Sequence, residues 1–491
     1  MWSAGHVDSK VYDAKEIASY PISINLWRSS MKKMLSKALV LLLVVALIVP
    51  FQMLATTDAN FYYDESEVLY EEMLFIEDFL SCPEFTDYLS SHFIYEFGEE
   101  FMNNLDTATA MADHIWDSFP TNRAGHRMYP DAFGGTYIDD YGNLVLLLVS
   151  DVADIGDMAT HARSTDISTR YVDFSHAELL QVFETIYYFL RDNWEDTTCL
   201  VVANIDSVSI DVIYNRVNVS LIDMSEYSVE QFNALVVEHP SLVFVQSVNC
   251  DAGGYVVSEC HMTVCATEQL LERSVSHTVR PGNAILRSIP NHGNFRQSIG
   301  FRATRNGHTG FVTTMHGPEL DYGNDIRRHR PLQRFDTFFF GGGVTDQHYI
   351  GWVDASNAAT DSVFVILELR HSIVNTGIAG TGTNVIGAEI MRNPQRGHPV
   401  TRFSQGGTTS PVSSMGSIME THHIHNVAAL GPVQTILASY TSIGGDSGGI
   451  ILSHNLHVAG IHVGRVANTP TAHSAFSRAE RIVRYLGVTP F

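Results

Sequence analysis

The C-terminal part of the chain contains a glycine-rich hexapeptide, Gly444-Gly445-Asp446-Ser447-Gly448-Gly449, which holds a single serine. A serine that acts as a nucleophile needs a tight turn that exposes its hydroxyl group. It also needs nearby backbone N–H groups that can face an oxyanion. Glycines on both sides allow the backbone angles that such a turn requires. An ordinary glycine turn in a β protein has the same composition, so the motif must be weighed with the rest of the chain.

The pentapeptide at 445–449 also fits the nucleophile elbow of α/β-hydrolases, in which an acid and then a histidine follow the serine. Only 44 residues follow Ser447, and Glu480 is the only acid among them. A parallel sheet with its crossover helices cannot be built in that length. The partners of Ser447 are therefore sought upstream.

The residue pattern of the sequence changes at about residue 280. Helical periodicity is lost, and short β-rich runs separated by glycines follow, among them 310–314, 362–369, 435–440 and 458–463. Only 477–486 has the pattern of a helix. Many short strands with regular turn signals predict a sandwich or a barrel. His316 closes one of these runs, and Asp361 stands at the start of another.

The order His316, Asp361, Ser447 and the residues around it resemble a known family. Thr313-Thr314-Met315 precedes the histidine, and Gly-Asp-Ser-Gly-Gly surrounds the serine. Together with the stretches 400–416 and 458–464, these features resemble the chymotrypsin-like serine endopeptidases, most of all their bacterial branch of streptogrisin and α-lytic protease type. The likeness covers roughly 295–491. It implies an all-β fold at 286–491, with two six-stranded antiparallel β-barrels and a C-terminal helix.

The resemblance also implies a role for each residue of the site. Ser447 would attack the peptide carbonyl, and His316 would take its proton and later return it to the leaving amine. Asp361 would fix the tautomer of His316 and stabilise the imidazolium. The backbone N–H groups of Gly445 and Ser447 would form the oxyanion hole.

The specificity pocket is inferred from the same likeness. Thr441 precedes Ser447 at the spacing of the family's pocket-base residue, and His462 and Val463 lie on the strand that follows the serine. We predict a pocket lined by these three residues. Because no acid stands at the position of Thr441, a strong preference for Arg or Lys is not expected.

Two departures from the family pattern leave part of the site open. Gly317 stands where the family usually has a cysteine after its histidine, so the disulfide beside the site is absent. Ser362-Val363 replaces the residues that usually follow the family's aspartate. The acid of the site is therefore Asp361 or one of three alternatives, Asp354, Asp346 and Asp336.

Residues 131–265 alternate strands and helices, which predicts an α+β domain. Two apolar runs within 134–149 flank an Asp-Asp-Tyr-Gly-Asn turn and predict a β-hairpin. Ser175 and Glu178 form a capping-box pattern before a helix. Bacterial proteases of this branch are made with pro-regions, and 211–248 resembles the β-α-β part of one. The remaining predicted elements are strands at 199–205, 207–211, 217–222 and 242–248, and helices at 179–194 and 229–238.

Charge is unevenly distributed along the chain, whose formal net charge is -24. Residues 55–282 hold 8 Arg against 39 Asp and Glu, whereas 283–491 hold 16 Arg against 12 acids. An acidic middle and a basic end could attract each other, so we expect contact in cis between the pro-region and the protease domain. The negative sign gives no support to nucleic-acid binding. The five cysteines all precede residue 266, so the protease domain contains no disulfide.

The N-terminal region has the pattern of a secretory signal peptide at 31–59. Lysines follow Met31, an apolar run extends over 38–49, and small residues come after Pro50. Residues 1–30 have no matching character and are interpreted as an upstream extension assigned in error. The other predicted divisions are a helical acidic segment at 60–130, the α+β domain at 131–265 and a linker at 266–285.

These observations predict a secreted serine endopeptidase that is made as a precursor and acts on protein or peptide substrates. A signal segment that is retained would instead anchor it at the cell surface. The alternative functions are a catalytically inactive, protease-like binding protein at the cell surface and an esterase on the same fold.

Adjacent histidines at 422–423 point in different directions on a strand or loop and lack a carboxylate partner. We therefore predict no metal and no cofactor.

Overall fold

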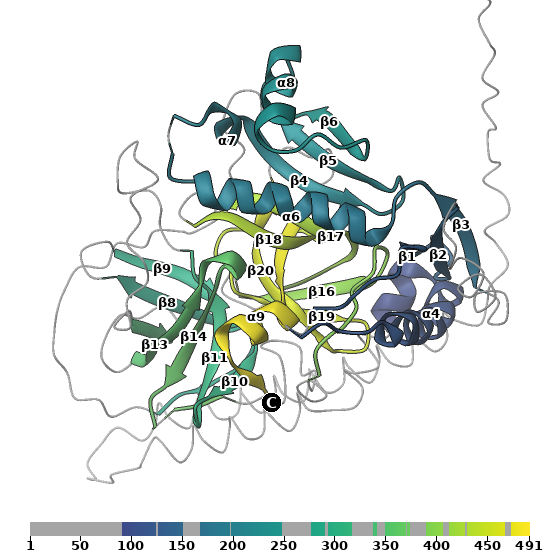
Figure 1. Ribbon diagram of the computed structural model, residues 1–491. Coiled ribbons are helices and arrows are strands. Elements are labelled where there is room, and N and C mark those ends of the chain that lie inside the picture. Colours follow the sequence, from purple (N-terminus) through teal and green to yellow (C-terminus); the bar gives the residue numbers. More distant parts are fainter. Residues whose placement is uncertain are drawn as a thin grey trace, which may run out of the picture. The chain divides into compact units, whose positions relative to one another are not determined.

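A computed structural model gives the fold of the chain (Figure 1). The signal segment at 31–59, the extension at 1–30 and the alternative acids Asp336 and Asp346 lie outside the described residues. No helix within the described ranges is both long and apolar enough to cross a membrane. The structure describes residues 91–123, 126–150, 167–196, 198–247, 276–289, 293–316, 337–340, 349–369, 371–373, 389–405, 412–427, 430–466 and 473–491.

A helix and a small sheet form the first part of the described chain. Helix α4 (Glu99–Ser118) lies in the segment predicted to be helical and packs on strands β1 (Phe133–Ile138) and β2 (Leu144–Val149). These strands pair antiparallel, which confirms the predicted hairpin, and β2 pairs with β3 (Ser168–Val172) in parallel. The hairpin turn needs its glycine, because a Cβ on Gly142, whose φ is +82°, would stand 2.3 Å from a backbone oxygen of α4.

The next part is an α+β unit, as predicted. Its first helix, α6 (His176–Asn193), begins with the expected capping box, in which Ser175 accepts from the N–H of Glu178 and the glutamate side chain accepts from the N–H of Ser175. The helix packs on a sheet over a shared apolar core. The other elements are β4 (Ile205–Asp211), β5 (Arg216–Leu221), α8 (Glu226–Leu235) and β6 (Leu242–Gln246).

One prediction in this unit is wrong: residues 199–205 do not form a strand. They form a short helix, α7 (Leu200–Asn204). Consecutive Val201 and Val202 are both buried, as on one side of a helical turn. The Asn204 side chain ends the turn by donating to the carbonyl of Asp223 and accepting from its N–H. A short apolar run has no periodicity that separates a helix from a strand.

Two large sheets make up most of the rest of the described chain, as the loss of helical periodicity predicted. A separate parallel pair is formed by β7 (Thr278–Val279) and β15 (Ser372–Ile373). The first has eight strands in the order β22-β10-β11-β14-β13-β12-β8-β9. Its members are β8 (Ala284–Ile289), β9 (Gly293–Ser298), β10 (Arg302–Arg305), β11 (His308–Thr314), β12 (Thr337–Phe340), β13 (Tyr349–Asn357), β14 (Ser362–Leu367) and β22 (Thr489–Pro490).

The second sheet has nine strands in the order β16-β19-β20-β21-β18-β17-β4-β5-β6. Strand β16 also pairs with β17, so these pairings run in a ring through β16 to β21. The C-terminal strands are β16 (Pro399–Ser404), β17 (Val412–Val427), β18 (Gly431–Ala438), β19 (Ile450–Ser453), β20 (Val458–Val466) and β21 (His473–Arg478).

Strand β4 of the α+β unit pairs antiparallel with β17, for example through Val208 and Ile424. The α+β unit therefore adds three strands to the C-terminal sheet, and α6 lies across a face of that sheet, in contact with β4 and β18 (Figure 1).

The C-terminal helix α9 (Ala479–Leu486) lies against both large sheets, close to its predicted range. Its buried Ile482 and Leu486 share one apolar core with Val312 and Phe364 of the first sheet and with Ile461 of the second. Burial of this kind stabilises a fold by about 25 cal/mol for each Å² of apolar surface. The core brings the ends of β11, β14 and the β18–β19 loop, which carry the predicted site, close together.

Candidate active site

Ser447 lies in the turn between β18 and β19, where close packing explains the surrounding glycines. Gly445 and Gly448 have backbone φ angles of +92° and +86°, which residues other than glycine rarely adopt. A Cβ on Gly448 would also stand 2.1 Å from the hydroxyl of Thr313 on β11. The motif thus lets the serine turn pack directly against the strand that leads to His316.

His316 follows β11 and is held at its backbone as well as at its ring. Its N–H donates to Oδ1 of Asp361 at 2.7 Å, and its carbonyl accepts from Nε2 of Gln297 at 2.8 Å. Its ring Nδ1 contacts Oδ2 of Asp361, and its Nε2 lies 2.9 Å from the Oγ of Ser447. The imidazole therefore stands between the carboxylate and the hydroxyl.

Asp361 owes its orientation to a left-handed backbone. A short 3₁₀ turn at Ala358–Thr360 precedes it, and Asp361 adopts φ +43° and ψ +51° before β14 begins. Aspartate tolerates this region better than most residues. Its Oδ1 accepts from the N–H groups of both Met315 and His316, which leaves Oδ2 for the imidazole.

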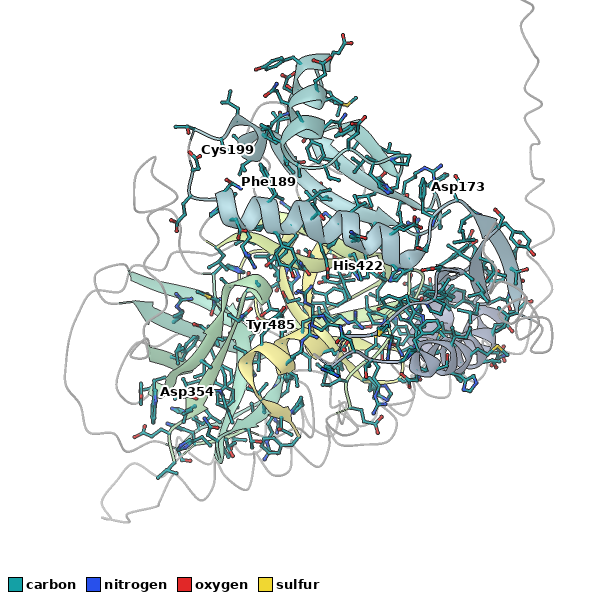
Figure 2. All side chains as sticks on the ribbon, in the orientation of Figure 1. Asp173, Phe189, Cys199, Asp354, His422 and Tyr485 are labelled. Carbon is teal, nitrogen blue, oxygen red and sulfur yellow. The ribbon has the colours of Figure 1, made fainter. Side chains whose placement is uncertain are left out.

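Among the alternative acids, Asp354 lies on β13 (Figure 2), where it forms an ion pair with Arg305. Asp336 and Asp346 are outside the described residues. The acid that the structure brings to His316 is therefore Asp361.

The hydrogen-bonded chain has the arrangement that activation of a hydroxyl group requires. With the proton of the imidazole on Nδ1, facing Asp361, the lone pair of Nε2 is directed at the Ser447 hydroxyl. The side chains of all three residues are no more than 1% exposed. Ser447 Oγ also lies 3.3 Å from the carbonyl of Val463, a second acceptor for its proton. This geometry can deprotonate the serine without exposing the carboxylate to water.

A buried ion pair that sequence reasoning missed fixes the serine turn. Arg402 on β16 pairs with Asp446, and both side chains are nearly inaccessible to solvent. Asp446 also accepts from the N–H of Ile443 at 2.8 Å and from the Ser404 hydroxyl at 2.6 Å. The available signal was an arginine inside the apolar run at 399–404, since a buried arginine requires an anionic partner.

The backbone donors predicted for an oxyanion hole lie in the same turn. Gly445 directs its carbonyl toward the Ser298 hydroxyl at 3.1 Å. Within the described ranges, neither the N–H of Gly445 nor that of Ser447 meets a hydrogen-bond acceptor. Both groups are therefore available to a developing negative charge.

The three residues predicted to line the specificity pocket differ in their surroundings. Val463 contacts Ser447 through its carbonyl. His462 is buried beside it, with Nδ1 2.9 Å from the hydroxyl of Tyr440, and its pKa is lowered well below the usual value by burial and then by the charge of Arg402. Thr441 is exposed, and its hydroxyl lies 2.9 Å from that of Ser414. Proximity to the serine thus supports Val463 and His462 more directly than Thr441.

The neighbouring histidines of β17 have separate environments. His423 is buried with its ring 3.3 Å from the Thr435 hydroxyl, whereas the His422 ring lies against Thr421 and His176. Within the described residues, no three His, Cys, Asp or Glu side chains form a group that could hold a metal ion.

Two family models match adjacent stretches of the chain before residue 248. Residues 97–177 match the family model of a Pro-like N-terminal domain, and residues 177–247 match that of a Pro-like C-terminal domain. No curated protein matches the chain.

Among similar solved structures, chymotrypsin of Cellulomonas bogoriensis is 24% identical, with 44% of this chain and 98% of that chain covered and a TM-score of 0.33. Protease A of Thermobifida fusca is 20% identical, with coverage of 43% and 98% and a TM-score of 0.33. A Nocardiopsis protease is 19% identical, with coverage of 43% and 99% and a TM-score of 0.33. The chain is thus similar to bacterial chymotrypsin-like serine proteases, and Pro-like N- and C-terminal domains precede its C-terminal sheets.

Proposed function

We propose that the chain is the precursor of a secreted serine endopeptidase, with the Pro-like domains at 97–247 as its pro-region. The observation that carries this proposal is the hydrogen-bonded chain from Asp361 through His316 to Ser447. Oriented groups of this kind turn a weak nucleophile into one that attacks a peptide carbonyl.

In the proposed reaction, the Oγ of Ser447 bonds to the carbonyl carbon of the substrate while Nε2 of His316 takes the hydroxyl proton. The N–H groups of Gly445 and Ser447 stabilise the negative charge on the former carbonyl oxygen. The C–N bond then breaks, and His316 gives its proton to the leaving amine. Water hydrolyses the acyl-enzyme by the same steps, and Asp361 stabilises the imidazolium each time it forms.

We propose that Val463, His462 and Thr441 line the substrate pocket beside Ser447. The carbonyl of Val463, close to the serine hydroxyl, supports this position. No carboxylate is among the three residues, so cationic side chains would gain no ion pair there.

We further propose that the two large sheets are the two six-stranded barrels of the chymotrypsin-like fold. The ring of pairings through β16 to β21 supports closure of the second one. The proposed divisions are a signal peptide at 31–59, a helical segment at 60–130, an α+β domain at 131–265, a linker at 266–285 and the protease domain at 286–491. The pro-region at 97–247 spans parts of the helical segment and of the α+β domain.

The pairing of β4 with β17 gives the pro-region a physical role. Sheets with many non-local contacts fold slowly, because loops must close before the contacts form. A preformed strand such as β4 supplies an edge on which β17 can order. We therefore propose that the pro-region assists folding of the protease domain in cis.

Hydrolysis of two substrate classes by the purified chain tests the proposed activity. An unfolded protein should be cleaved by the Ser413→Ala variant, which removes an exposed hydroxyl, and should resist the Ser447→Ala variant. Turnover of an ester without cleavage of the protein would identify an esterase instead. Correctly folded chain that turns over neither substrate would leave the inactive binding protein as the function.

A further inference from the structure

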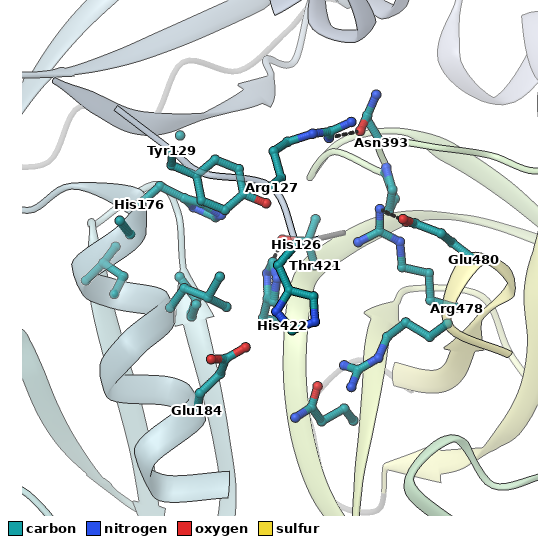
Figure 3. A pocket seen from close by; sticks show the side chains of 18 of the residues that line it. His126, Arg127, Tyr129, His176, Glu184, Asn393, Thr421, His422, Arg478 and Glu480 are labelled. Carbon is teal, nitrogen blue, oxygen red and sulfur yellow. Dashed lines mark hydrogen bonds and ion pairs between the residues drawn. The ribbon is translucent and has the colours of Figure 1, made fainter. Parts of the chain in front are cut away.

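A cavity of about 840 Å³ lies where the Pro-like domains meet the C-terminal part of the chain, separate from Ser447. One wall is formed by the residues around Tyr129 and by α6, and the other by Asn393, β17 and α9. Figure 3 shows His176 and Glu184 of α6 on one side and Arg478 and Glu480 on the other, with His422 between them. We refer to it as the arginine-lined cavity.

The side chains around this cavity carry an excess of positive charge. Two carboxylates, Glu184 and Glu480, line it, against the five guanidinium groups of Arg127, Arg191, Arg478, Arg481 and Arg484. This excess is unusual for a chain whose net charge is -24. Three of the arginines have carboxylate partners, at 2.7–3.0 Å. Within the described residues, Arg481 and Arg484 form no ion pair with a carboxylate.

Several donors at the cavity are buried without an acceptor. In the part of the chain that the structure describes, nothing accepts from Nε of Arg478 or from Nε of Arg481, and Nε2 of His176 also has no partner. A buried donor without a partner destabilises the fold, so such groups are rare unless water or a ligand satisfies them. The lining of the cavity is therefore polar, and its own residues do not supply all the hydrogen-bond partners that its buried groups need.

The charges at the cavity also act on one another. The pKa of Arg478 is lowered by burial, and the nearby cations of Arg481 and Arg127 lower it further, although Glu480 opposes this. Burial, and after it the charges of His176, Arg478 and Arg481, hold the pKa of His422 well below its usual value. A bound anion would relieve this repulsion among like charges.

We propose that the arginine-lined cavity binds a small anionic ligand that carries phosphate or carboxylate groups. Guanidinium groups match both kinds of anion through paired N–H donors. Because the two walls come from the Pro-like domains and from the C-terminal part, the bound anion holds these parts together and stabilises the precursor. The proposal does not depend on the chemistry of Ser447.

The test uses the full chain with Ser447→Ala, which prevents self-cleavage. Inorganic phosphate and citrate are titrated separately at ionic strength matched with chloride, and binding is followed by calorimetry and by the Tm. We expect saturable binding of at least one anion and a Tm that rises with its concentration. Phosphate binding alone identifies a phosphate ligand, and citrate binding alone identifies a polycarboxylate. If neither phosphate nor citrate binds more tightly than chloride, the proposal is overturned.

Two variants with opposite expected effects tie the binding to the cavity. Arg481→Gln should weaken the affinity by about tenfold or more, because it removes a charged donor that would bond to the anion. Arg465→Gln removes the same charge outside the cavity and should leave the affinity unchanged. Glu184→Gln removes a repelling charge and should strengthen binding by about threefold. Equal affinities of the Arg481→Gln and Glu184→Gln variants would contradict the assignment, and if Arg481→Gln fails to fold, Glu184→Gln decides alone.

Discussion

The Ser447 site and the arginine-lined cavity are both polar regions in the interior of the chain, but they differ in how their polar groups are satisfied. At the first, both ring nitrogens of His316 and both carboxylate oxygens of Asp361 have partners within the chain. At the second, buried donors of Arg478 and Arg481 lack acceptors among the described residues. The polar groups of the first site are paired with one another before any ligand arrives, whereas at the second the proposed anion would supply the missing partners.

The largest expected effect concerns Asp361, the carboxylate that pairs with His316 at the Ser447 site. Asp361→Asn retains the size of the side chain but removes the charge that stabilises the imidazolium and selects the tautomer of His316. We expect kcat for peptide hydrolysis to fall by about 10⁴-fold, the loss given by the same change in the Ser-His-Asp template. Asp354→Asn, at the ion pair with Arg305, should retain activity. Comparable activities of the two variants would exclude Asp361 as the acid.

A second prediction concerns the ion pair beneath the serine turn. Arg402→Leu leaves Asp446 buried and uncompensated, so the free energy of unfolding should fall by about 3–5 kcal/mol. Arg305→Leu breaks a pair that is partly exposed and should cost about 1 kcal/mol or less. Denaturant unfolding of both variants in the Ser447→Ala background measures the difference. Equal losses would mean that the buried pair does not fix the turn.

A third prediction uses pH at the wall of the arginine-lined cavity. Burial lowers the pKa of His176 from 6.5 to about 4, and the rings of Trp116, Tyr129 and His422 face it. The unfolded chain binds the proton more tightly than the folded chain does. The stability that neutral His176 contributes to the folded chain is therefore present above pH 6.5 and is lost as the pH falls toward 4. The loss reaches about 3 kcal/mol.

Unfolding of the full chain at a series of pH values measures this loss. The neighbouring charges of Arg478, Arg481, Glu184 and Glu480 are shared by the parent chain and by the His176→Phe variant, so the difference between them isolates the histidine. His176→Phe should flatten the dependence between pH 6.5 and 4. A profile as steep as that of the parent chain would rule out His176 as its source.

The smallest expected effect concerns the start of α6, the helix that carries His176 and Glu184. Ser175→Ala removes the side chain that accepts from the N–H of Glu178 and should destabilise the chain by about 1 kcal/mol. Thermal unfolding measures the change, with Ser413→Ala as a control at an exposed position. A variant as stable as the parent chain would mean that other contacts satisfy this end of the helix.

The sequence predicted those parts of the molecule that depend on local patterns. The hairpin at 134–149 and the capping box of Ser175 follow from short motifs, and the serine turn follows from its glycines. The predicted residues His316, Asp361 and Ser447 lie together, although beforehand only their order in the chain and the family resemblance of the residues around them related them.

Other features depend on contacts between distant residues and could not be predicted in this way. The run at 199–205 forms a helix because packing decides between two states that its composition allows equally. The partner of Arg402 is 44 positions further along the chain, and the arginine-lined cavity joins Arg127 with Arg481. No periodic pattern in the sequence predicts contacts between residues that are so far apart in the chain.

The proposed nucleophile can be identified directly by mapping the adduct of a fluorophosphonate probe by mass spectrometry. The phosphorus bonds to a serine oxygen as fluoride leaves, which requires a hydroxyl group that a base has activated. We predict one adduct, on Ser447, with its formation abolished in the His316→Ala variant. Folded chain that forms no adduct, or forms it equally well without His316, would contradict the proposed mechanism.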